Sequence, residues 1–303
     1  MKVDLRQLDY FLEIVERRSL TAAAAELRVT QPTLTKSIRQ LEESLGVRLL
    51  ERLPRGVVPT EFGAVLARHA GLVGVQLKDA VAEIEALRSG RVGHVAIGAG
   101  PAWLRRLLPL AVTRAQAASP GLAVYLTGGF DDGLLRLLRQ GELDLVVAEL
   151  PEPDTAPDLA LLELASDDLG IVCRSGHPLA GCPGLVPTDL VGCPWILPAG
   201  NSRARRRLDA LFIGRGLEAP AASIETDSMA FMLAAIRLSD GIGYATSRLL
   251  TLEEGSGLVM LDVEGLSGRR TAGVISRRQA RLSPAAQAIV DELAAICRLD
   301  DHN

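Results

Sequence analysis

The chain has 303 residues, of which 48% are hydrophobic and 23% are charged, and its formal net charge at pH 7 is −4. This composition excludes disordered and fibrous proteins, and the length predicts two or three compact units. No uncharged apolar run approaches the roughly 18 residues of a membrane span, and charged residues interrupt the N-terminus, so we expect a cytoplasmic protein without signal peptide or membrane segment.

Three helices are predicted near the N-terminus. Apolar side chains recur at helical spacing in residues 5–15, and a second helix is predicted at Ala22–Leu27, after the cap residue Ser19. Thr30 is the predicted N-cap of a third helix, which ends at Gly46. This order predicts a small helical head.

The third helix has two different faces. One stripe is apolar and should pack inward, because its members fall on one side of the helix at 3.6 residues per turn: Leu34, Ile38, Leu41 and Leu45. The opposite side carries amides, hydroxyls and cations, the groups that read base edges and bind phosphates in the major groove. The candidate DNA contacts on this helix are Gln31, Pro32, Thr33, Thr35, Lys36 and Arg39.

A β-hairpin wing is predicted after the third helix, because strand patterns flank the turn Pro54-Arg55-Gly56. Arg52 and Arg55 are its candidate DNA contacts, and an arginine at the tip would enter the minor groove or clamp a phosphate. Residues 28–60 carry six Lys or Arg against three Glu, whereas residues 91–303 carry 20 basic against 25 acidic side chains. Any one such side chain is equally compatible with a solvated surface, but together they predict a winged helix-turn-helix at residues 1–60.

Residues 5–70 resemble the LysR-type transcriptional regulators. The matching segments are Leu5-Arg6-Gln7-Leu8, Ser19-Leu20-Thr21-Ala22-Ala23-Ala24, Val29-Thr30-Gln31-Pro32-Thr33-Leu34-Thr35, Leu41-Glu42-Glu43-Ser44-Leu45-Gly46 and Pro59-Thr60-Glu61-Phe62-Gly63. In that family the positions matching Gln31, Pro32, Thr35 and Lys36 contact the operator, and the one matching Arg55 reaches the minor groove. Thr30 and Lys36 stand where Ser and Arg are common, so hydroxyl and charge are retained.

Residues 61–90 are predicted to form a linker helix with an apolar seam. Its positions alternate by four and three: Phe62, Leu66, His69, Val73, Gln76 and Ala80, followed by Ile84 and Leu87. A helix of this length extends roughly 40 Å, so a partner helix is the simplest explanation; packing on the chain's own C-terminal domain is the alternative. The resemblance implies dimers, which in this family often pair into tetramers.

Residues 91–303 alternate between strand and helix patterns, which predicts an α/β domain with parallel sheets covered on both faces. The resemblance implies a two-lobed effector domain of the periplasmic-binding-protein fold. Lobe I is expected at about 91–163 and 269–303, and lobe II at about 164–268. Crossovers between the lobes are expected near Leu162–Ser166 and Gly265–Arg270. Among the expected elements are a helix at Leu104–Ala118 and a strand at Leu169–Cys173.

Loops between strands and helices are the candidate effector site. The segment Gly98-Ala99-Gly100-Pro101-Ala102-Trp103 has the beginning of a dinucleotide fingerprint, but Trp103 replaces its third glycine, so we expect ligand contacts instead. Either Asn201 or Ser202 is a helix cap, a ligand contact or both. The candidate effector residues are Gly100, Pro101, Ala102, Trp103, Gly129, Asp131, Gly200, Asn201, Ser202 and Asp227.

Asp131 bears on the chemistry of the effector. A buried carboxylate would repel a simple carboxylic acid, so we expect a neutral polyol or sugar, or an amine-bearing ligand, with Trp103 as an apolar platform. The alternative is that Asp131 only caps a helix at Gly133–Arg139 and faces solvent.

The sequence therefore predicts a LysR-type transcriptional regulator that binds double-stranded operator DNA as a homodimer or homotetramer and responds to a small-molecule effector. An enzyme of the doubly wound class and a solute-binding protein are the rivals, but neither explains the N-terminal head. No catalytic constellation is visible at the loops, so we expect no enzyme, cofactor or metal. The four cysteines have no ligand spacing, and we expect core thiols at Cys173, Cys182, Cys193 and Cys297.

Overall fold

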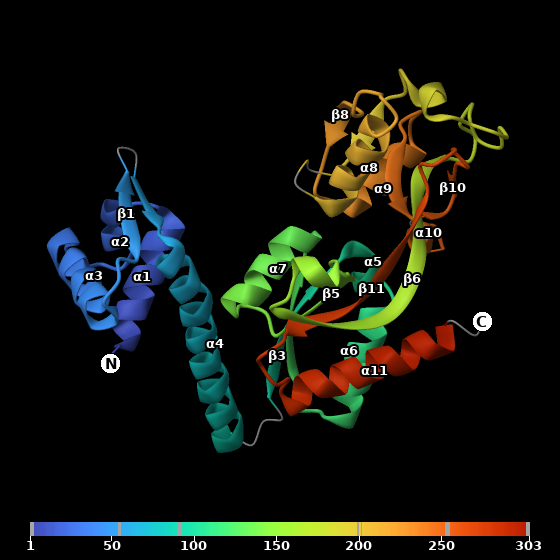
Figure 1. The fold of residues 1–303 in the computed structure, drawn as a ribbon. Coiled ribbons are helices and arrows are strands. Elements are labelled where there is room, and N and C mark those ends of the chain that lie inside the picture. Colours follow the sequence, from blue (N-terminus) through green and yellow to red (C-terminus); the bar gives the residue numbers. More distant parts are fainter. Residues whose placement is uncertain are drawn as a thin grey trace. The chain divides into compact units, whose positions relative to one another are not determined.

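The computed structural model describes residues 3–53, 56–89, 93–198, 200, 202–251 and 255–300. Apart from residues 139–141, the chain divides into two compact units, residues 1–89 and residues 90–303, which Figure 1 shows as ribbons. Each unit is described by itself.

The first unit begins with the three expected helices. Their bounds are α1 (Leu5–Arg17), α2 (Leu20–Glu26) and α3 (Gln31–Leu45). Side-chain caps fix where they start: the Ser19 hydroxyl accepts from the Ala22 N–H at 3.2 Å, and Thr30 accepts from Thr33 at 3.4 Å. Gly46 ends α3 in the left-handed conformation, with φ of 70°, which favours glycine. The predicted caps of α2 and α3 and the predicted end of α3 are thus confirmed.

The apolar stripe of α3 packs into the core of this head, where Leu34, Ile38 and Leu41 are buried beside Phe11 and Ile14. Two short strands follow as an antiparallel hairpin: β1 (Leu50–Leu53) and β2 (Gly56–Pro59). The unit ends in the 29-residue helix α4 (Glu61–Ser89), which confirms the long linker helix. Figure 1 shows α4 extending away from the head.

The second unit contains two lobes joined by two long strands, β6 (Leu159–Arg174) and β11 (Gly268–Arg277). The first lobe contains β3 (His94–Ala99), α5 (Pro101–Leu104), α6 (Leu107–Ala118), β4 (Ala123–Gly128), α7 (Asp131–Gln140), β5 (Leu145–Glu149), the short 3-10 helix η1 (Pro153–Thr155) and α11 (Pro284–Asp300). The second contains η2 (Pro187–Leu190), β7 (Trp195–Leu197), α8 (Arg203–Ile213), β8 (Ala222–Glu225), α9 (Met229–Arg237), β9 (Gly243–Thr246), α10 (Ser247–Leu250) and β10 (Leu258–Met260).

The main sheet has the order β10-β6-β11-β5-β3-β4, with β9 also paired to β6. As expected, β3 is parallel to β4 and β5, and β7 is parallel to β8. The expectation of parallel sheets is met only in part, because β11 pairs antiparallel with β5 and β6, and β9 and β10 pair antiparallel with β6. Helices cover both faces of the first lobe's sheet: α6 and α11 pack on one face and α7 on the other.

The crossovers and one helix of the first lobe differ from the sequence expectation. The crossovers are one pair of hydrogen-bonded strands, because β6 and β11 pair with each other over their whole shared length. The expected strand Leu169–Cys173 is therefore only the second half of β6. The expected helix Leu104–Ala118 is broken at Arg106, whose φ of −138° is not helical, so it forms α5 and α6. Within the described part of the chain, no helix is long and apolar enough to cross a membrane.

Candidate functional site

The outward face of α3 presents the predicted DNA contacts. Gln31, Pro32, Thr33, Lys36 and Arg39 are exposed, and Thr35 is half-buried. The Thr33 hydroxyl lies 2.8 Å from that of Thr30, so it also takes part in the cap of the helix. Arg39 donates to Glu43 at 3.1 Å, a pair that is exposed and therefore weak. The structure thus brings the predicted helix residues onto one accessible surface.

The hairpin is fixed against α3 by a residue that the sequence reasoning missed. The Glu42 carboxylate accepts hydrogen bonds from the backbone N–H groups of Leu49 and Leu50, at 2.7 and 3.2 Å. Between α3 and the hairpin lies an open hollow of about 990 Å³, lined among others by Arg39 and Arg52. Glu42 therefore links α3 to the start of the wing. The predicted contact Arg55 lies outside the described residues.

The seam of α4 leaves apolar side chains in solvent. Phe62, Val73 and Ile84 are 56%, 41% and 63% exposed. Leu66 differs, because it is half-buried and packs against the core of the head. The side chains of Gln76 and Leu87 lie outside the described part of the helix. A partner helix typically covers an exposed apolar stripe of this kind.

The predicted effector residues of the first lobe do not form one exposed loop. Trp103 is 3% exposed and packs in the core below β3, so the expected apolar platform is wrong. Ala102 is also buried, and it packs with apolar residues of the second lobe. The backbone N–H groups of Gly100 and Gly129 donate to Val147 and Ala99, at 2.9 and 3.2 Å, so neither is free for a ligand. Pro101, beside them, is half-buried.

In the second lobe, Ser202 is the N-cap of α8: its hydroxyl accepts from the Arg205 N–H at 3.2 Å and it is 2% exposed. Ser228 caps α9, and the candidate effector residue Asp227 before it is exposed. Gly200 is exposed, and Asn201 lies outside the described residues. The sequence left two roles open for Ser202, and the structure confirms the role of helix cap.

Asp131 is the first residue of α7, so the helix begins two residues earlier than expected. Its carboxylate has no hydrogen bond to any described residue. Burial raises the pKa of Asp131, while the charges of Arg203 and Arg270 oppose the rise and that of Glu149 adds to it. Asp131 is half-buried and lies in a group of charges.

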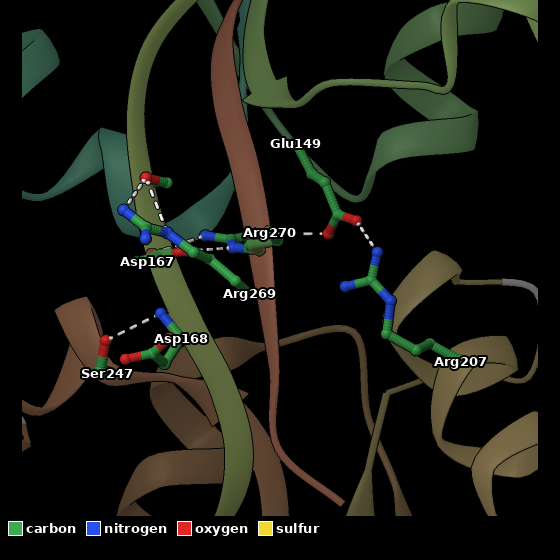
Figure 2. A network of polar contacts seen from close by, with 8 residues as sticks. Glu149, Asp167, Asp168, Arg207, Ser247, Arg269 and Arg270 are labelled. Carbon is green, nitrogen blue, oxygen red and sulfur yellow. Dashed lines mark hydrogen bonds and ion pairs between the residues drawn. The ribbon is translucent and has the colours of Figure 1, made fainter. Parts of the chain in front are cut away.

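That group, which we call the interlobe cluster, consists of Asp131, Glu149, Asp167, Arg203, Arg207 and Arg270. Glu149 ends β5, is 4% exposed, and forms ion pairs with Arg207 of α8 and with Arg270 of β11, the latter at 3.6 Å. Arg270 also donates to both carboxylate oxygens of Asp167, at 2.5 and 3.1 Å (Figure 2). Arg203 donates to the Glu149 carbonyl at 3.1 Å. Charges from both lobes thus meet at the crossover strands.

Three buried polar atoms of the second lobe have no hydrogen-bond partner among the described residues: Arg207 Nη1, the Tyr244 hydroxyl and Thr246 Oγ1. Burial raises the pKa of Tyr244 to about 12, while the charge of Arg207 lowers it and that of Glu149 raises it. Thr246 follows two residues later on β9, on the same face. Buried polar atoms without partners cost free energy and often mark functional sites.

Sequence reasoning missed Glu149, Arg207 and Arg270. Glu149 could have been found by the rule that selected Gly100 and Gly129, which places ligand contacts at the carboxyl ends of parallel strands, because Glu149 also ends such a strand. Arg207 belongs to an arginine-rich first half of α8, which was a visible signal. Arg270 gave no signal, because its role depends on the pairing of two strands about 100 residues apart.

A second open hollow, of about 650 Å³, lies at the crossover strands and is lined among others by Asp167, Asp168 and Arg269. There Arg269 donates to the Ser166 hydroxyl at 2.8 and 3.1 Å, and the Asp168 N–H donates to the Ser247 hydroxyl at 3.2 Å (Figure 2). Ser166 and Asp168 lie two residues apart on β6, so their side chains lie on the same face of the strand.

The cysteines only partly follow the expectation of core thiols. Cys173 and Cys297 are buried and Cys193 is half-buried, but Cys182 is exposed. Burial raises the pKa of Cys173 to about 11, and it also raises the pKa of Cys193. Neither thiol has the lowered pKa of a redox sensor.

Two family models match the chain: the LysR substrate binding domain over residues 88–298, and the bacterial regulatory helix-turn-helix protein of the lysR family over residues 5–64. The chain is 36% identical over 243 residues to the HTH-type transcriptional regulator GbpR of Azospirillum brasilense, which covers 80% of this chain and 71% of that protein. It is 36% identical over 267 residues to PcaQ of Agrobacterium fabrum, which covers 87% and 85%.

Solved structures share the fold. CbnR, a LysR family transcriptional regulator, superposes with a TM-score of 0.57 at 21% identity, over 97% of this chain and 99% of that one. Full-length CbnR complexed with its target DNA superposes with a TM-score of 0.56 at 20% identity, with the same coverage. The chain belongs to the LysR family of transcriptional regulators. The predicted family, and the predicted order of a helix-turn-helix head, a long helix and an α/β domain, are confirmed.

Proposed function

We propose that this LysR-type regulator acts in the cytoplasm, where it binds operator DNA as a dimer or tetramer and changes its DNA binding when a small molecule occupies the interlobe cluster. Residues 1–60 are assigned to DNA binding, 61–90 to dimerisation, and 91–303 to the effector. Lobe I is assigned to about 91–163 and 269–303, and lobe II to about 164–268. The relatives are regulators, and we propose neither a catalytic role nor a cofactor.

The exposed polar face of α3 is the observation that supports the DNA contacts. Gln31 and Thr35 are assigned to base edges, because amides and hydroxyls form the hydrogen bonds that distinguish bases in the major groove. Lys36 and Arg39 are assigned to phosphates, and Arg52 to the backbone beside the wing. The short side chains of Pro32 and Thr33 permit close approach of the helix.

The exposed stripe on α4 supports dimerisation. Phe62, Val73 and Ile84 lie on one side of a helix about 43 Å long, and burial of such a stripe against a second copy removes apolar area from water. A dimer also matches a DNA-reading head that contacts only a few base pairs, because two heads recognise two half-sites.

Footprinting of the full-length protein on the DNA that flanks its own gene tests the proposal. We expect protection of two half-sites spaced by whole turns of the double helix, and loss of protection in the double variant Gln31→Ala, Lys36→Ala. Arg281→Ala, which changes an exposed arginine of the second unit, is the matched control. Specific binding that survives the double variant would contradict the assignment of α3.

A further inference from the structure

We propose that the effector is a small zwitterion, of which α-amino acids are the simplest examples, whose ammonium group binds Asp131 and whose carboxylate binds Arg207 and the Tyr244 hydroxyl. This inference rests on the proposed effector site, since it names the chemistry of the molecule that occupies it. It replaces the wider sequence expectation of a polyol, sugar or amine.

The charge balance of the interlobe cluster favours a ligand without net charge. Its three carboxylates, on Asp131, Glu149 and Asp167, face three guanidinium groups, on Arg203, Arg207 and Arg270. A simple anion or cation would leave one unbalanced charge in a group that includes the nearly buried Glu149 and Asp167, which is costly. A zwitterion leaves the balance unchanged.

The hydrogen-bonding atoms without partners favour a ligand that has one positively charged and one negatively charged group. The Asp131 carboxylate only accepts and has no donor among the described residues, so it requires a donor from the ligand. Arg207 Nη1 only donates, and the Arg207 side chain is already held on its other side by Glu149. The Tyr244 hydroxyl is a second donor without a partner among the described residues; Tyr244 is 2% exposed, and the charge of Arg207 acts on its phenol.

The charges of the site favour a zwitterion over a neutral polyol. Hydroxyl groups satisfy the geometry of both sites, but they leave the carboxylate of Asp131 without a counter-charge, and hydrogen bonds between charged groups are roughly twice as strong as neutral ones. The aromatic platform on which a sugar ring would stack is missing at the predicted position, because Trp103 is in the core. Thr246 Oγ1, on the same face of β9 as Tyr244, offers a further partner to the carboxylate.

The test is calorimetric titration of the full-length protein with each of the twenty L-α-amino acids. For each amino acid that binds, the protein is then titrated with the amine and with the carboxylic acid of the same carbon skeleton. A set of sugars and polyols is titrated in the same way. We expect at least one amino acid to bind and its two single-charge analogues to bind at least about tenfold more weakly, because each lacks one charged hydrogen bond. Asp131→Asn and Tyr244→Phe should each weaken that binding, whereas Asp262→Asn, an exposed control, should not.

Stronger binding by a plain acid, a plain amine or a polyol would overturn the inference, as would unchanged binding of the amino acid in Asp131→Asn, or no binding by any amino acid. Operator footprinting of the same samples keeps the two questions separate. A protein that binds its operator and responds to another class of compound refutes the zwitterion alone. A protein without specific operator binding refutes the proposed function.

Discussion

Asp167 and Arg270 face each other across the two crossover strands, and the guanidinium group donates to both carboxylate oxygens, at 2.5 and 3.1 Å. The two residues are direct partners in the register of β6 and β11, so the ion pair lies where both lobes are joined. Arg270 also reaches Glu149, at 3.6 Å. The strands that connect the lobes therefore also hold the interlobe cluster in place.

Loss of one partner in this pair should be costly. The side chains of Arg270 and Asp167 are only 13% and 7% exposed, and removal of Arg270 leaves two nearly buried carboxylates without their shared cation. We expect Arg270→Met to lower the free energy of unfolding of the second unit by about 3–5 kcal/mol. Urea denaturation measures this. Arg269→Met, an exposed neighbour, should cost less than about 1 kcal/mol, and equal losses in both variants would contradict the argument.

Lys36→Ala and Thr35→Ala should affect DNA binding in different ways. Loss of the lysine removes a phosphate-directed charge, so affinity should fall for any sequence and the slope of log affinity against log salt should become shallower by about one. Loss of the Thr35 hydroxyl or the Gln31 amide should chiefly relax base preference. Fluorescence anisotropy over a range of salt concentrations, on the operator and on unrelated DNA, distinguishes the two. Unchanged affinity in Lys36→Ala would refute the assignment of the helix.

The features that sequence predicted well are local ones. The caps at Ser19 and Thr30, the apolar stripe of α3 and the stop at Gly46 are each determined by residues within one or two turns, so a periodic pattern is enough to find them. The family resemblance rested on the same short segments. The head and the long helix could therefore be predicted almost completely.

The features that sequence missed depend on distant pairing. Leu159–Asp168 gave no clear strand signal, because this half of β6 is partly exposed and owes its extended form to β11. Glu149 and Arg207 lie 58 residues apart and meet only once both lobes are folded. Trp103 was assigned to the site because it follows a strand, but its large apolar area is buried in the core instead.

The N-terminal fragment of residues 1–88 should be dimeric. The exposed side chains of Phe62, Val73 and Ile84 provide a stripe that a second copy can cover, and the fragment contains all of it. Sedimentation equilibrium at tens of micromolar measures the mass. Val73→Glu should shift the fragment toward monomer, since it places a charge in the seam, whereas Glu61→Gln should not. A monomeric wild-type fragment would show that the stripe is covered by another part of the chain.

Cysteine reactivity should follow burial. Cys182 is exposed, whereas Cys173 is buried and its pKa is raised from 9.0 to about 11, which lowers its thiolate fraction at pH 8 by about 100-fold. We expect rapid alkylation of Cys182 in the native protein, slow alkylation of Cys173 and Cys193, and uniform alkylation after unfolding. Mass spectrometry of peptides from timed reactions measures this. Rapid labelling of Cys173 at pH 8 would contradict its burial.

Asp131→Asn should stabilise the ligand-free protein at neutral pH. The pKa of this carboxyl is raised by burial, so the folded state disfavours its charged form relative to the unfolded chain. Below the unfolded pKa both states hold the proton and ionisation costs nothing. The cost appears as pH rises above the unfolded pKa and reaches its full size above the folded pKa. The amide cannot ionise, so the melting temperature of Asp131→Asn should rise relative to that of the wild type between pH 4 and pH 7. Scanning calorimetry across this range, with Asp262→Asn as the exposed control, measures the difference. A variant that is less stable than the wild type at pH 7 by as much as at pH 4 would show that the Asp131 carboxylate imposes no ionisation cost, and that the interlobe cluster does not hold a charge in need of a partner.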